Sequence, residues 1–498
     1  MCEIPLRVTR WQARVLNARF EAARQMYNAL LGEAMRRLRL MRQSRLYSTA
    51  RVIDSTDKER LAERRGLFQS ARTEYGFSEY SLSQYATKLR KSWLGDHLDA
   101  HVAQKLCKRA FGATEKVMFG RAKHVRFKGK RGLHSVEGKS NETGIRWRVD
   151  HVEWSGLNLP MVKGSGKDPV IAHGLLQRVK YVRLIRREIR GKDRFYAQLV
   201  CEGLAYQKPD QVVHSGTVGL DIGPSTIAVY SGHEALLEQF CQPIVEDQKY
   251  IRRLQRHLDR QRRANNPECF DERGRAIKGK HPRNKSRRQR ATEIILREYK
   301  RRQAAYRKTL HGKLANRILS LGNDIRTEDV SYKAWQKMFG RSIGLRAPSS
   351  FIAILKRKAE SAGGQVVEFN TRSTALSQVC LCGQKHKKPL KLRIHDCSCG
   401  ITMQRDLFSA YLASFVESNR LQVITANDSW SGAEPLLRAA WKQATQNQPA
   451  SGRAMPSSFG NNRSQSGSPE KEDRAVHEAL DAVGITVESQ REWIGTGL

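Results

Sequence analysis

The chain has 498 residues, of which 39% are apolar; it can bury sizeable cores, and its length suggests roughly three domains. Its 90 Lys or Arg against 49 Asp or Glu give a formal net charge of +41, which favours a nucleic-acid partner because a polyanion offsets the self-repulsion. No apolar run approaches the length of about 18 residues that crosses a bilayer, and the start has no signal-peptide pattern, so we expect a cytoplasmic protein.

The N-terminal part is predicted to begin with a short strand and to continue as helices. Ile4, Leu6 and Val8 alternate along the first ten residues, as in a half-buried strand. From residue 11 to residue 111, apolar residues recur at helical spacing among many basic ones. A helix-bundle core explains this apolar stripe.

Residues 123–203 change to a period-two alternation of basic with apolar or aromatic residues. This pattern turns one face of a strand inward and leaves a basic face outward, which suits a β-barrel that grips a phosphate backbone. A solvated sheet face explains the alternation as well, and the total charge is what favours nucleic acid. The candidate nucleic-acid contacts in this segment are Arg126, Lys128, Lys130, Arg131, Arg146 and Arg148.

A strongly basic helical insertion is expected over residues 249–320. Lys249 to Lys308 contain 22 Lys or Arg and 6 Asp or Glu, too uneven a ratio for self-compensating ion pairs. The apolar spacing predicts a short helix, a basic loop at residues 274–284 and then a longer helix. Phosphate contact is the more economical explanation, and the candidates are Arg252, Arg253, Arg256, Arg287, Arg288 and Arg290.

Three carboxylates occupy positions that each look ordinary when taken singly. Asp221 lies in an apolar run that predicts a strand, a tight turn and a returning strand, where an unpaired carboxylate is unfavourable unless it binds a metal. Glu328 is expected at the end of a strand that follows a long helix. Asp406 is expected in the first turn of a helix, where the helix dipole favours a negative charge.

Four of the nine cysteines fall within 20 residues, as two C-x-C pairs that each end in glycine. In a reducing compartment such a cluster indicates a metal site, and tetrahedral Cys₄ zinc is the first choice. The expected ligands are Cys380, Cys382, Cys397 and Cys399, although His386 or His395 could substitute for one of them.

The order of these features resembles the TnpB family of transposon-encoded RNA-guided nucleases and the related compact type V CRISPR effectors. The similarity covers residues 217–416 well, including His311-Gly312-Lys313 ahead of Glu328, and extends more loosely to the N-terminal half. Two departures stand out: the family usually has C-x-x-C pairs, and it commonly has Asn at the position of Phe408.

The resemblance implies that Asp221, Glu328 and Asp406 are the catalytic acids of a metal-dependent, RuvC-like DNA endonuclease. They would hold two Mg²⁺ ions, or Mn²⁺, about 4 Å apart, and one structural Zn²⁺ would lie in the ribbon. The implied partners are a guide RNA and a target DNA, in a prokaryotic cytoplasm, with a short flanking motif read by the N-terminal domains.

The predicted fold is α+β and multidomain: a β-barrel wedge domain with an inserted helical recognition domain, followed by an RNase H-like (RuvC) α/β nuclease domain with an inserted zinc ribbon. The expected boundaries are 1–10 and 112–212 for the wedge, 11–111 for the recognition domain, 213–375 and 403–445 for the nuclease domain, 376–402 for the ribbon and 446–498 for a mostly disordered tail.

Two other functions are left open by the sequence. A guided DNA-binding protein without efficient cleavage would accommodate Phe408 and the shortened cysteine pairs. A transposase or resolvase that works without RNA would share the acids but would co-purify with no discrete transcript. The sequence does not distinguish a CRISPR effector from a transposon-encoded nuclease, nor a monomer from a dimer.

Overall fold

The computed structural model describes residues 1–244, 248–279, 281, 284–389 and 392–446. Its content is mixed α and β, as predicted, and the chain divides into two compact units, Met1–Tyr206 and Gln207–Leu498. Of the expected disordered tail, all but Gln446 lies outside the described residues. No helix among the described residues is both long enough and apolar enough to cross a membrane.

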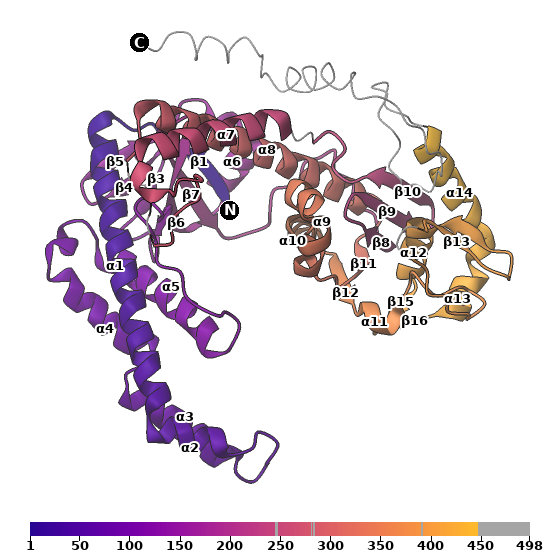
Figure 1. Cartoon of the computed structure of the whole chain (residues 1–498), viewed down its shortest axis with the longest axis horizontal. Coiled ribbons are helices and arrows are strands. Elements are labelled where there is room, and N and C mark those ends of the chain that lie inside the picture. The colour runs from indigo at the N-terminus through magenta and orange to yellow at the C-terminus, as the bar shows by residue number, and fades with distance from the viewer. Residues whose placement is uncertain (245–247, 280, 282–283, 390–391, 447–498) are drawn as a thin grey trace. The chain divides into compact units, whose positions relative to one another are not determined.

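The helices of the first unit follow a short N-terminal strand, as the apolar spacing predicted. Thr9 and Gln12 form a reciprocal capping box that starts the 34-residue helix α1, and Asp99 caps α5, which packs along α1 (Figure 1). The elements are β1 (Cys2–Pro5), α1 (Arg10–Gln43), α2 (Arg45–Val52), α3 (Leu61–Glu74), α4 (Glu79–Arg90) and α5 (Ala100–Met118).

The strands of the first unit form two antiparallel sheets with the orders β1-β7-β6-β2 and β3-β4-β5. A bridge between Leu6 and Met161 joins the two sheets, and a closed barrel remains a prediction. The elements are β2 (Ser135–Glu137), β3 (Arg146–Arg148), β4 (His151–Trp154), β5 (Leu157–Pro160), α6 (Pro169–Leu175), β6 (Val179–Ile189) and β7 (Lys192–Cys201).

The second unit is built on a five-stranded sheet with the order β10-β9-β8-β11-β12. β10, β9 and β8 are antiparallel neighbours, whereas β8, β11 and β12 run parallel. The strands are β8 (Thr217–Ile222), β9 (Thr226–Ser231), β10 (Glu234–Gln239), β11 (Asp324–Glu328) and β12 (Gln365–Phe369).

Helices cover both faces of this sheet. One face packs against the C-terminal part of α8 and against α10, and the other packs against α12 and α14, so that α10 and α12 lie on opposite sides (Figure 1). The helices are α7 (Gln248–Asn265), α8 (Arg287–Leu319), α9 (Tyr332–Arg346), α10 (Pro348–Ser361), α11 (Thr371–Thr374), α12 (Arg405–Ala413), α13 (Val423–Asp428) and α14 (Trp430–Gln446). The predicted pair of basic helices is therefore present as α7 and α8.

Two small hairpins complete the unit: β13 (Ile394–Asp396) pairs with β14 (Thr402–Gln404), and β15 (Val416–Glu417) pairs with β16 (Arg420–Leu421). β14 ends directly where α12 begins. The β13–β14 hairpin is therefore continuous with the helix that carries Asp406.

Candidate metal and nucleic-acid sites

Asp221 and Glu328 lie at the carboxyl ends of two neighbouring parallel strands. In the register of β8 and β11, Leu220 is opposite Thr327, and the two acids are the next residue on each strand. Adjacent strands are about 4.8 Å apart. The sheet therefore brings together two carboxylates that are more than 100 residues apart in the sequence.

The third acid reaches the same face of the sheet from α12. Val218 and Leu220 point into the core on the α8–α10 side, so the alternating residues Gly219 and Asp221 face α12. A Cβ placed on Gly219 would lie 1.9 Å from the carbonyl oxygen of Ala410, which shows how closely the helix approaches. Asp406, in the first turn of this helix, is only 7% exposed.

Both carboxylate oxygens of Asp406 have partners from other elements. The Thr226 hydroxyl, on β9, donates a buried hydrogen bond of 3.2 Å to Oδ2. The guanidinium groups of Arg393 and Arg405 lie 3.6 Å and 3.7 Å from Oδ1. Asp406 is therefore held from the sheet on one side and from the β13–β14 hairpin on the other.

The three acids form one electrostatic cluster. Burial raises the pKa of Asp221 well above its ordinary range, and the charges of Asp406 and then Glu328 raise it further, against the opposing effect of Arg405 and Arg393. Burial also raises the pKa of Glu328 to about 7. Carboxylates that destabilise one another in this way are ligands suited to a hard divalent cation.

Among the described residues, the four cysteines are the group of three or more potential ligands that lie close enough together to hold a single ion. The three carboxylates do not converge on one point in this way. A two-ion site spreads its carboxylates over centres about 4 Å apart, so it does not require such convergence.

Cys380, Cys382, Cys397 and Cys399 bring their four sulfur atoms within 4.8 Å of one another. Sγ–Sγ distances are 3.5 Å for Cys380–Cys399 and 3.6 Å for Cys382–Cys397, close to the edge of about 3.8 Å of a tetrahedron with 2.3 Å zinc–sulfur bonds. A backbone N–H from Cys399 lowers the pKa of Cys397 to about 6, whereas burial raises the pKa of Cys380 and of Cys399. The donor set and spacing fit zinc.

The shortened pairs are accommodated by glycine turns. Gly383 and Gly400 have φ angles of +81° and +93°, and their N–H groups donate to the carbonyls of Cys380 and Cys397 at 3.0 Å. Neither candidate histidine belongs to the group of thiols: His386 bonds to Gln384, and the His395 ring lies against Phe408, 4.2 Å between centroids.

Phe408, the second departure from the family pattern, is a core residue. It is 1% exposed and contacts the rings of His395, Trp430 and Tyr411. Its side chain joins α12 to the β13–β14 hairpin and to α14.

The candidate nucleic-acid contacts divide into two kinds. Arg131 forms an ion pair with Asp193 at 2.5 Å, and Arg146 and Arg148 share Glu153, at 3.0 Å and 3.3 Å. The other candidates are exposed and form no ion pair with any described residue, except that Lys128 is half-buried. The exposed ones are Arg126 and Lys130 in the first unit and Arg252, Arg253, Arg256, Arg287, Arg288 and Arg290 on α7 and α8.

Sequence reasoning missed three residues that position the acids: Gly219, Thr226 and Arg393. Gly219 contacts α12, and Thr226 and Arg393 contact Asp406, only once the distant segments of the chain have folded together. A partial signal existed for Gly219, because a glycine inside an apolar strand often marks a close backbone approach. Nothing in the sequence placed Thr226 or Arg393 beside Asp406.

Residues 349–412, which include the four cysteines and Asp406, match the family model described as Cas12f1-like, TNB domain. This match confirms the predicted resemblance to the compact type V effectors. Similar solved structures include a Cas12f1–sgRNA–target DNA complex (10% identity, TM-score 0.37, 82% of this chain and 97% of that chain) and a CRISPR-Cas12f ternary complex (12% identity, TM-score 0.24, 81% and 82%). No curated protein matches the chain.

Proposed function

We propose, from the match of residues 349–412 to the Cas12f1-like TNB domain, that the chain is an RNA-guided DNA endonuclease of the compact type V and TnpB kind. The observation that carries the proposal is the meeting of Asp221, Glu328 and Asp406 on one face of a mixed sheet, next to the helix that follows the four-cysteine site.

Asp221, Glu328 and Asp406 are proposed to hold the catalytic metal ions of a RuvC-like, RNase H-like domain. Two Mg²⁺ ions, or Mn²⁺, bound there would activate water and stabilise the leaving oxygen in phosphodiester hydrolysis. The chain's own contribution is to orient the carboxylates: Thr226 and Arg393 bracket Asp406, and Arg405 adds a second positive charge beside it.

Cys380, Cys382, Cys397 and Cys399 are proposed to bind one structural Zn²⁺. Since Cys397 and Cys399 lie in the turn of the β13–β14 hairpin and β14 leads directly into α12, a closed site would brace the helix that presents Asp406. The zinc then has a structural purpose next to the catalytic acids.

The basic surfaces are proposed to bind the guide RNA and the target DNA. The exposed arginines of α7 and α8 would neutralise phosphates, and the first unit would supply the wedge and recognition domains that read a short motif in the flanking duplex. In this division of labour, base pairing reads the sequence and the protein reads backbone shape.

The experiment that tests the guided part is sequencing of the RNA that co-purifies with the full chain. A discrete transcript supports the proposal, and its type, repeat–spacer or transposon-end, identifies the genetic context. A chain that carries no discrete RNA but cuts DNA ends or junctions is a transposase or resolvase instead. A chain that holds its RNA and binds target DNA, with equal lack of cutting by wild type and Asp221→Ala, is a guided binder.

A further inference from the structure

Arg393 connects the β13–β14 hairpin, whose turn carries two of the four clustered cysteines, to the acid cluster. It lies one residue before β13 and four before Cys397. Its carbonyl accepts a 2.8 Å hydrogen bond from the Arg405 N–H, and its guanidinium lies 3.6 Å from Asp406 Oδ1. Backbone and side chain of one residue therefore both contact the first turn of α12.

The two supports of Asp406 differ in rigidity. Thr226 lies on β9, inside a five-stranded sheet that is covered on both faces. Arg393 precedes a hairpin with three paired positions on each strand, Ile394 to Asp396 against Thr402 to Gln404. His395 and Met403 pack this hairpin against Phe408 and α12, while its far end carries Cys397 and the exposed Cys399, so closure of that end adds to how firmly Arg393 is held.

We propose that Arg393 is a positioning residue that couples the four-cysteine site to Asp406, so that zinc in the hairpin raises the affinity of the acid cluster for divalent metal. The inference rests on the proposed function, since it takes the carboxylates as metal ligands and the thiols as a zinc site. Zinc fixes the hairpin, the hairpin fixes Arg393, and Arg393 with Thr226 holds both oxygens of Asp406.

The guanidinium has two opposing effects on a metal ion at the carboxylates. It orients Asp406, whose Oδ1 lies 3.6 Å from it. Its own positive charge also repels a divalent cation. We expect orientation to prevail over this repulsion, and this gives the effect of Arg393→Gln a definite sign.

Mn²⁺ binding to the full chain without nucleic acid, measured by calorimetry, tests the coupling directly. Four proteins are compared: wild type and Arg393→Gln, each with intact cysteines and with the Cys382→Ser/Cys399→Ser change, with zinc content measured in all four. Loss of zinc should weaken Mn²⁺ binding by wild type about five- to tenfold, which is near the lower end of the affinity changes that coupled sites usually show. Zinc-loaded Arg393→Gln should be weakened to a similar extent, and zinc loss should then add less than about twofold.

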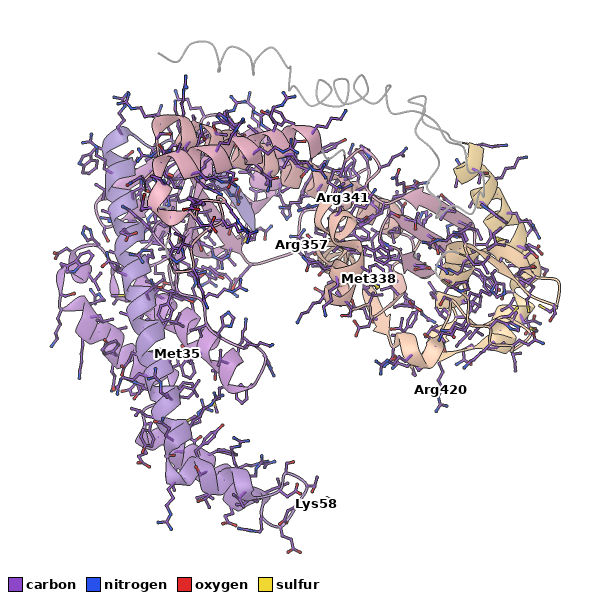
Figure 2. The ribbon with its side chains drawn as sticks, in the orientation of Figure 1. Met35, Lys58, Met338, Arg341, Arg357 and Arg420 are labelled. Carbon is purple, nitrogen blue, oxygen red and sulfur yellow. The ribbon has the colours of Figure 1, made fainter. Side chains whose placement is uncertain are left out.

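Two further variants separate orientation from charge. Arg393→Lys keeps the positive charge without the planar fork and should recover only part of the wild-type affinity. Arg420→Gln is the matched control, because Arg420 is exposed on the β15–β16 hairpin and points away from the fold (Figure 2), and it should bind Mn²⁺ like wild type.

Three results would overturn the inference. Equal weakening by zinc loss in wild type and Arg393→Gln would show that the coupling bypasses Arg393, and no effect of zinc loss in wild type would show that the sites are independent. Tighter Mn²⁺ binding by zinc-loaded Arg393→Gln would make the guanidinium a competing cation. The last comparison needs no cysteine variant, so it holds even if zinc loss unfolds the chain. Failure of the proposed function looks different: Asp221→Ala would then bind Mn²⁺ as well as wild type.

Discussion

Gly219 and Ala410 lie in direct backbone contact: a Cβ on Gly219 would be 1.9 Å from the Ala410 carbonyl oxygen and 2.7 Å from the Ser414 nitrogen. Gly219 is two residues before Asp221, and Ala410 is four residues after Asp406. The contact therefore sets the distance between the strand that carries one acid and the helix that carries another.

Gly219→Ala should destabilise the second unit and impair metal binding at the acids. Both groups that the new methyl would meet are backbone, so either α12 or β8 must shift, and overpacking of this kind costs typically 1–3 kcal/mol. Denaturant unfolding and Mn²⁺ calorimetry measure the two effects. Gly312→Ala is the control, because Gly312 lies in helix α8 and a Cβ there would meet nothing within 4 Å. This substitution should leave the free energy of unfolding unchanged or raise it by up to about 1 kcal/mol. Equal stability of the two variants would contradict this account of the close approach.

The raised pKa of Glu328 predicts a loss of stability as the pH rises. With a pKa of about 7 in the folded chain and an ordinary value of 4.5, the folded state keeps a proton that the unfolded state has released. Stability should therefore fall between about pH 4.5 and pH 7 and level off above, with Asp221 acting in the same direction. The contribution of Glu328 is on the order of 3 kcal/mol.

Urea unfolding from pH 4.5 to pH 8 without divalent metal measures this slope. Glu328→Gln should flatten it, whereas Glu272→Gln, an exposed carboxyl in the loop between α7 and α8, should leave it unchanged. If Glu328→Gln retains the full slope, the carboxyl is not buried as described. Mg²⁺ should restore stability above pH 7, because it binds the deprotonated cluster.

Local sequence signals predicted each acid's element correctly: a strand for Asp221, a strand end for Glu328 and a first helical turn for Asp406. They also located the two basic helices and the cysteine group. These features depend on periodicity and spacing within about 30 residues, which is the range over which such patterns are informative.

What the sequence did not reveal depends on contacts between distant segments. The ion pairs that occupy Arg131, Arg146 and Arg148 need carboxylates placed by strand pairing, so a count of basic residues overstated the free charge in the first unit. The role of Phe408 likewise depends on His395 and Trp430, which approach it only in the folded chain.

Phe408→Asn, the change toward the residue that the family commonly has, should destabilise the chain rather than improve its chemistry. The ring fills a buried site among three other rings, and its loss creates a cavity and buries an amide, at a cost on the order of 3–5 kcal/mol. Guanidinium unfolding checks the cost. Phe339→Asn, at a position that is 37% exposed on α9, should cost much less. A stable Phe408→Asn protein with faster cleavage would show instead that Phe408 limits the active site.

The salt dependence of RNA binding should distinguish the two kinds of candidate contact. Arg252→Gln/Arg253→Gln/Arg256→Gln removes three exposed charges from α7, and the slope of log affinity against log salt should fall by about 0.7–0.9 for each phosphate that is no longer neutralised. The matched triple at Arg131, Arg146 and Arg148, whose side chains already pair with carboxylates, should change the slope less. Filter binding over a range of salt concentrations gives both slopes, and a larger change for the second triple would reverse the assignment.

The central claim is that Asp221, Glu328 and Asp406 together form a metal-dependent nuclease site. Its most direct test is plasmid cleavage in Mg²⁺ by the full chain with its co-purified RNA reprogrammed to the plasmid, comparing wild type with Asp221→Asn, Glu328→Gln and Asp406→Asn. The account predicts cutting by wild type and a loss of at least about 10³-fold in each variant, with RNA binding retained. Cleavage by any of the three at the wild-type rate would contradict it.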